Sequence, residues 1–205
     1  LQSGSYIEHV EKNFTEASLY TEELAAILDK HIGSGTSILD IGTGELTTLS
    51  LLVKKLQSKP ENIYAFDISW SRIYKGLSFA KKHMGDDYGR LTPFVGDITE
   101  IPLRNNSSEL GGTLLDKVQI QNISNPLNPT YCFIIAPPSA PTQPAIGETT
   151  ASAIFSAPGT DHALRPLGDF YFSDDTGFCF PSLKSIPILK ANAAILASAL
   201  IEDGK

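Results

Sequence analysis

Residues 38–48, ILDIGTGELTT, decide how the chain folds. The segment opens with an apolar run typical of a buried parallel strand, reaches the acid Asp40 and then turns over Gly42 and Gly44. A Cβ atom at either glycine would block a close ligand or the backbone angles of a sharp turn. From Leu46 the sequence LTTLSLLVKKLQ has the pattern of a helix. The segment therefore predicts a strand, a ligand-binding turn and a helix.

Strand and helix patterns alternate on both sides of this segment. Residues 15–32 place apolar side chains on one helical face and predict a helix. Residues 62–69 (NIYAFDIS) predict a second strand, residues 71–84 a second helix and residues 90–98 a third strand. Strands and helices that alternate at this spacing indicate βαβ units, which form a parallel sheet covered by helices.

The alternation stops after residue 110. Residues 111–123 and 128–138 read as two strands joined by the turn-forming SNPLNP, which predicts an antiparallel pair at a sheet edge. A parallel sheet without its central strands would leave backbone groups unpaired. We therefore expect a segment to be missing between Leu110 and Gly111.

Composition divides the chain into three parts. Residues 1–136 form the α/β domain, residues 137–160 form a linker rich in Pro, Ser, Thr, Ala and Gly, and residues 161–205 form a small tail. The tail predicts a strand, a DDTG turn, a second strand and a closing helix. The expected fold is a Rossmann-like mixed sheet with helices on both faces, an antiparallel terminal strand pair and a β-hairpin/helix appendage.

Charge and cysteine content limit the partners and the compartment. A formal net charge of -7 argues against a broad electrostatic grip on nucleic acid or an anionic membrane. Cys132 and Cys179 have no partner at metal-ligand or redox spacing, which favours buried free thiols in a reducing cytoplasm. Neither a leader pattern nor an apolar run of membrane-spanning length is present, so a cytoplasmic protein without membrane contact is expected.

Acids recur at the ends of the three predicted strands. Asp40 precedes the glycine turn and suits a ligand with a cationic amino-acid end. Asp67 follows the turn by roughly 20 residues, where a carboxylate binds the two hydroxyls of a ribose. Asp97 could accept from an exocyclic amine while the N–H of Ile98 meets a ring nitrogen. Each acid alone would be read as a helix cap, but three at the same sheet edge favour a ligand site.

A dinucleotide site is the first alternative. Its fingerprint, G-x-G-x-x-G, would need a third glycine where this chain has Thr47. Asp40 would also be an unfavourable neighbour for a pyrophosphate. An enzyme that binds NAD or a nucleotide sugar therefore remains open as a rival interpretation.

Three stretches together resemble a known family. ILDIGTGELTT, IYAFDIS and FVGDITEIPLRNNSSEL resemble, in order and spacing, the first three motifs of class I S-adenosylmethionine-dependent methyltransferases. LLDKVQIQNISNPLNPTYCFII is similar to the antiparallel strands that close the sheet of that family. The resemblance covers residues 15–136 and implies a methyltransferase that uses S-adenosyl-L-methionine.

The resemblance also implies which residues bind the cofactor. The glycine turn would line its methionine end, the acid of the second strand would bind the ribose, and the acid of the third strand would hold the adenine. The implied residues are Asp40, Gly42, Thr43, Gly44, Asp67, Ile68, Asp97 and Ile98. One departure is that Glu45 and Leu46 stand where many members have a further glycine.

The tail resembles a second kind of protein. YFSDDTGFCFPSLKSIPILKANAAIL is similar to the end of the small zinc-ribbon-like protein that activates methyltransferases. A zinc ribbon needs four thiolate or imidazole ligands in two close pairs, whereas Cys179 stands alone here, so no metal is expected. The tail could contact a protein partner or a second copy of the chain.

The leading hypothesis is a methyltransferase whose acceptor is a small molecule, a protein or an RNA. No catalytic base can be assigned, since methyl transfer needs one only if the acceptor must lose a proton early. An N-terminal helix with Tyr6, Phe14 and Tyr20 would form a lid over the site or simply pack on the core. The second rival hypothesis is a degenerate, non-catalytic domain that serves as a binding partner.

Overall fold

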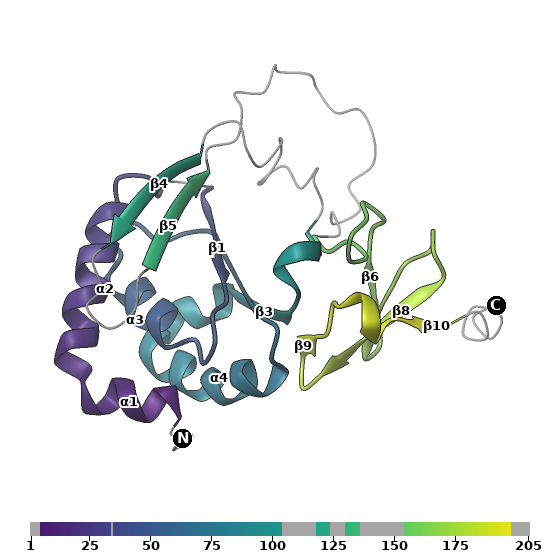
Figure 1. Cartoon of the computed structure of the whole chain (residues 1–205), viewed down its shortest axis with the longest axis horizontal. Coiled ribbons are helices and arrows are strands. Elements are labelled where there is room, and N and C mark those ends of the chain that lie inside the picture. Colours follow the sequence, from purple (N-terminus) through teal and green to yellow (C-terminus); the bar gives the residue numbers. More distant parts are fainter. Residues whose placement is uncertain (1–4, 34, 104–117, 124–129, 136–153, 198–205) are drawn as a thin grey trace. The chain divides into compact units, whose positions relative to one another are not determined.

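The computed structural model describes residues 5–33, 35–103 and 154–197, together with the backbone of residues 118–123 and 130–135 (Figure 1). The chain divides into two compact units, Leu1–Val95 and Gly96–Lys205. The proposed break between Leu110 and Gly111, the boundary at residue 136 and most of the predicted linker lie outside the described residues. The same holds for the side chain of Cys132.

The first unit has the predicted α/β architecture. Strands β1, β2 and β3 form a parallel sheet in that order, with Asp40 opposite Ala65 and Asp67 opposite Val95. The elements in chain order are α1 (Tyr6–Lys12), α2 (Phe14–Leu28), β1 (Ser37–Ile41), α3 (Thr47–Lys55), β2 (Asn62–Asp67), α4 (Trp70–Met84), η1 (Gly85–Arg90) and β3 (Leu91–Val95).

Helix α3 packs against both α2 and α4, and α4 packs on β2 and β3. The helix predicted over residues 15–32 is present as α2, and a separate helix, α1, precedes it with a break at Asn13. There the side-chain amide and the backbone N–H of Asn13 both donate to the carbonyl of His9, ending α1. Val10 of α1 is buried against Leu51 of α3 and Phe79 of α4, which anchors the extra helix to the core.

Strand β2 is buried on both of its faces. Ile63 and Ala65 point to one face and Tyr64 and Phe66 to the other, and none exposes more than 3% of its surface. Phe66 stacks on Phe94 of β3 with ring centroids 5.1 Å apart. The apolar composition that predicted a buried parallel strand is therefore confirmed.

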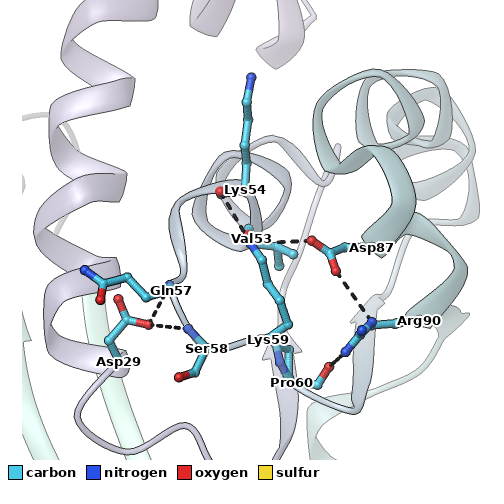
Figure 2. Close-up of polar contacts among 9 residues, drawn as sticks. All are labelled: Asp29, Val53, Lys54, Gln57, Ser58, Lys59, Pro60, Asp87 and Arg90. Atoms are coloured by element: carbon cyan, nitrogen blue, oxygen red, sulfur yellow. Dashed lines mark hydrogen bonds and ion pairs between the residues drawn. The ribbon is translucent and has the colours of Figure 1, made fainter.

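A polar network ties the amino ends of β2 and β3 to the helices (Figure 2). Lys59 Nζ donates to the carbonyl of Val53 in the last turn of α3 at 2.6 Å and lies 3.4 Å from Asp87 Oδ2. Arg90 Nη1 donates to the carbonyl of Pro60 at 2.6 Å, and its Nε lies 3.5 Å from Asp87 Oδ1. A cation at the end of α3 also matches the negative end of the helix dipole.

Replacing Lys59 by methionine is expected to lower the free energy of unfolding by about 1 kcal/mol, because the apolar stem stays while two hydrogen bonds, one of them long, and one ion pair are lost. Chemical denaturation measures this. The matched Lys54→Met change removes an exposed lysine nearby and should cost less than about 0.5 kcal/mol. An equal cost for both variants would contradict the structural role of Lys59. Ligand affinity should not change, since Asp40 and Asp67 lie at the opposite strand ends.

The second unit begins with η2 (Ile98–Glu100) and contains the predicted antiparallel pair, β4 (Val118–Ile123) and β5 (Thr130–Ile135). The register runs from Val118 opposite Ile135 to Ile123 opposite Thr130. The pair is confirmed, but within the described residues it forms a two-stranded sheet of its own. In the part of the chain that the structure describes, the backbone hydrogen bonds of β4 and β5 join these two strands to each other. The sequence predicted instead that the pair lies at the edge of the parallel sheet.

The tail forms an antiparallel sheet in the order β10-β8-β7-β6, with β9 paired to β8. The predicted hairpin is confirmed as β7 and β8, whose turn closes where the N–H of Ser173 donates to the carbonyl of Phe178 at 3.0 Å. The strands are β6 (Arg165–Leu167), β7 (Phe170–Phe172), β8 (Phe178–Leu183), β9 (Ile186–Pro187) and β10 (Ile195–Leu196).

The predicted closing helix is wrong for the described part of the tail. Ala191–Ala193 make one 3-10 turn, after which Ile195 pairs with Cys179 and Leu196 with Phe178. Alanine favours a helix by only fractions of a kcal/mol per residue, so backbone pairing with β8 decides the conformation. Cys179 is buried in this sheet as a free thiol, as the sequence predicts.

None of the described helices combines the length and the apolar composition needed to cross a membrane.

Candidate functional site

The carboxyl ends of β1 and β2 meet at the glycine turn. Gly42 and Gly44 have φ angles of +75° and +56°, which residues with a Cβ atom rarely adopt. Asp40 precedes the turn within β1, and Asp67 is the last residue of β2. With Thr43 between the glycines, the first unit thus brings five of the predicted residues to one edge of the sheet.

The backbone N–H groups of the glycine turn form hydrogen bonds within the protein. Those of Gly42 and Thr43 both donate to the carbonyl of Phe66, at 2.8 and 3.0 Å. The N–H of Gly44 donates to Oδ2 of Asp67 at 2.9 Å. These three amides are therefore committed within the protein, whereas a phosphate at a glycine turn binds through free amides.

Asp67 is buried, with 5% of its surface exposed, and both of its carboxylate oxygens have donors. Oδ2 accepts the N–H of Gly44 and lies 3.6 Å from Nη1 of Arg72, while Oδ1 accepts the N–H of Ser69 at 2.9 Å. Arg72 was not among the residues predicted from the sequence. Its contact with Asp67 follows from the way α4 starts after β2, and no motif marks it.

Asp40 is the second acid of this edge. Although some of its surface stays accessible, removal of its carboxyl from water by burial raises the pKa, the Thr43 side chain lowers it in part, and the charge of Asp67 raises it further. Two carboxyls that influence each other in this way make the edge acidic. A cationic ligand group would stabilise the ionised form of Asp40.

Leu46 adopts a left-handed conformation, with φ of +58°, directly after Glu45 in the glycine turn. Such a conformation costs a non-glycine residue roughly 1–2 kcal/mol. The side chain of Leu46 is fully buried, which contributes about 1.5–3 kcal/mol. Burial of the leucine therefore offsets its backbone strain, and the turn keeps its shape with a non-glycine residue at position 46.

Glu45 joins the glycine turn to the N-terminal helix. Its Oε2 accepts the hydroxyl of Ser5 at 2.7 Å and the N–H of Ile7 at 2.8 Å, and the residue is only 6% exposed. The sequence Ser5-x-x-Glu8 has the spacing of a helix capping box, yet the cap comes from Glu45 instead. Position 45 was noted in the sequence only as a departure from glycine. The contact docks α1 on the turn, whereas a lid role for this helix stays a prediction.

Replacing Glu45 by alanine is expected to lower the free energy of unfolding by about 1–2 kcal/mol, since two hydrogen bonds are lost. Release of α1 should also speed amide hydrogen exchange at Ile7 by at least about tenfold, because local opening then costs less. Glu45→Gln keeps one acceptor oxygen and should give intermediate values. Glu23→Ala removes an exposed glutamate of α2 and serves as the control. Unchanged exchange at Ile7 in Glu45→Ala would contradict the docking role.

Two exposed isoleucines flank the acids. Ile41, at the end of β1, is 43% exposed, and Ile68, directly after Asp67, is 60% exposed. Apolar side chains beside carboxylates could contact the apolar and polar parts of an amphipathic small molecule. Ile68 is the sixth predicted residue at this edge.

Asp97 and Ile98 belong to the second unit. The carboxylate of Asp97 accepts the N–H and the hydroxyl of Thr99, at 2.9 and 2.7 Å, and caps η2. The two hydrogen bonds from Thr99 lower the pKa of Asp97. Ile98 is 63% exposed. Asp97 therefore caps a helical turn, which was the alternative to a ligand role in the sequence. Adenine binding by Asp97 stays a prediction.

No protein-family model and no curated protein sequence matches the chain. Among solved structures the chain is similar to the methyltransferase domain of a bacterial Hen1 protein, with 23% identity, a TM-score of 0.31, and coverage of 40% of this chain and 41% of that one. It is also similar to a chain of the complex between the Haloferax volcanii Trm112 methyltransferase activator and a methyltransferase, with 20% identity, a TM-score of 0.32, and coverage of 45% and 37%.

A third similar structure is an uncharacterised protein from Burkholderia thailandensis, with 8% identity, a TM-score of 0.34, and coverage of 61% of this chain and 37% of that one. The similar regions span between 37% and 41% of the three other chains. At these identities the likeness concerns the fold alone.

Proposed function

We propose that the chain binds S-adenosylmethionine at the carboxyl ends of β1 and β2 and acts as a methyltransferase. The observation that carries the proposal is the chemistry of the glycine turn. Its amides are bound within the protein, while a buried carboxylate, Asp67, and a second acid, Asp40, lie beside it. These carboxylate acceptors suit hydroxyl and ammonium groups, which donate hydrogen bonds, better than phosphates.

The residues fit this cofactor in distinct ways. Asp67 would accept the ribose hydroxyls, and Asp40 would face the ammonium group of the methionine end. Ile68 would lie against the apolar part of the ligand, since its side chain is exposed. When bound, the cofactor supplies a methyl group on a positively charged sulfonium, and the protein aligns it with the acceptor and excludes water. Adenine binding by Asp97 and Ile98 is proposed from their place after β3.

The rival interpretation, NAD or a nucleotide sugar, requires a pyrophosphate at the turn. A pyrophosphate would find the amides of Gly42, Thr43 and Gly44 already bonded and two carboxylates nearby. Repulsion between those carboxylates and a doubly charged ligand group disfavours this interpretation.

Ligand-induced stabilisation tests the proposal. S-adenosylhomocysteine, the demethylated product, should raise the midpoint of thermal unfolding by several degrees, because a ligand at 100 times its Kd stabilises the folded state by about 2.7 kcal/mol. NAD at the same concentration should leave the midpoint unchanged. A shift with NAD alone, or no shift with S-adenosylhomocysteine, would contradict the proposal.

Turnover separates an enzyme from a non-catalytic binding domain. Methyl-labelled cofactor should transfer its label to one of three acceptor classes, which are small molecules, proteins and RNA. Binding of S-adenosylhomocysteine without transfer to any class would favour the non-catalytic interpretation.

A further inference from the structure

Arg72 occupies the space above the glycine turn. Its guanidinium lies 3.6 Å from Asp67, and its side chain is 51% exposed while that of Asp67 is 6% exposed. A Cβ atom placed on Gly44 would lie 2.6 Å from Nη2 and 3.1 Å from Cζ of Arg72. The guanidinium therefore rests directly on the backbone of Gly44, and the missing side chain at this position makes room for it.

This position coincides with the place where the proposed ligand would meet Asp67. The backbone N–H groups of Gly44 and Ser69 satisfy the carboxylate from within the protein, and Arg72 covers its solvent side. A ligand hydroxyl can reach Asp67 only if the guanidinium moves away. Movement is feasible, because half of the arginine side chain is already in solvent and Asp67 keeps its two backbone donors.

We propose that Arg72 competes with the ligand for Asp67 and so lowers the affinity of the site. Binding exchanges the Arg72–Asp67 ion pair for hydrogen bonds from the ligand hydroxyls. An ion pair with one exposed partner is worth a factor of about 1.5 to 5 in an equilibrium constant. The competition lowers the apparent affinity by that factor, since the ligand binds only the fraction of molecules in which Asp67 is uncovered.

The inference rests on the proposed function, and titration calorimetry with S-adenosylhomocysteine tests both separately. Binding to the wild type tests the function. The ratio of Kd values between the wild type and Arg72→Ala tests the role of Arg72, and the alanine variant should bind about 1.5 to 5 times more tightly. Arg72→Lys keeps the charge but not the planar group and should lie between the two. Lys75→Ala, an exposed cation one turn along α4, is the matched control and should leave the Kd unchanged.

Weaker binding by Arg72→Ala would mean that the arginine contacts the ligand, and it would overturn the proposal. An unchanged Kd would also overturn it, because Arg72 would then lie outside the path of the ligand. Should the alanine variant unfold, Arg72→Lys decides the question by the same ratio. A wild type that binds no S-adenosylhomocysteine, with a normal unfolding transition, would remove the proposed function itself.

Discussion

Replacing Asp67 by asparagine is expected to abolish detectable binding of S-adenosylhomocysteine and to lower the free energy of unfolding by about 2–3 kcal/mol. Both carboxylate oxygens of Asp67 accept backbone N–H groups, from Gly44 and from Ser69. An asparagine has one acceptor oxygen and one NH₂ group, so one of these buried donors would face another donor. The variant also loses the charge that faces Arg72.

Two measurements check this result. Urea denaturation gives the change in stability, and titration calorimetry at a temperature where the variant is folded gives the affinity. Asp86→Asn makes the same chemical change at an exposed acid of the first unit and should alter neither quantity. If Asp67→Asn bound S-adenosylhomocysteine like the wild type, the ribose-binding role of Asp67 would be wrong.

Local patterns predicted the elements around this acid. The apolar run of β2 is buried on both faces of the sheet, so its composition alone identified it. The glycines at positions 42 and 44 were identified because their positive φ angles are a local requirement of the turn. In both places the sequence determines the structure within a few residues, and prediction succeeded.

Contacts between distant residues could not be predicted in this way. Glu45 accepts hydrogen bonds from Ser5 and Ile7, some 40 positions earlier in the chain, and no spacing rule connects them. Arg72 reaches Asp67 because of the way α4 follows β2. The tail helix failed for the same reason, since pairing of Ile195 with β8 outweighs a weak helical preference. The features that could not be predicted from the sequence are those that contacts between distant residues determine.

The largest steric effect is expected for Gly76→Ala. A Cβ atom at Gly76 would lie 2.3 Å from the carbonyl oxygen and 2.5 Å from the carbonyl carbon of Glu45. These are backbone atoms of the glycine turn, so no side-chain rotation relieves the clash. Alanine gains roughly 1 kcal/mol of helix propensity over glycine. Overpacking costs about 1–3 kcal/mol or more, and the upper part of that range applies where backbone meets backbone.

Gly89→Ala provides the matched control, because a Cβ atom there meets nothing within 4 Å. Denaturation should show Gly76→Ala destabilised by a net amount of about 2 kcal/mol and Gly89→Ala changed by less than about 0.5 kcal/mol. Equal stabilities would mean that α4 can move away from the turn at little cost.

Gly76 lies on the same helix as Arg72, one turn further along. A displaced α4 should therefore also move the guanidinium away from Asp67. The folded fraction of Gly76→Ala is then expected to bind S-adenosylhomocysteine with a changed Kd, while Gly89→Ala keeps that of the wild type.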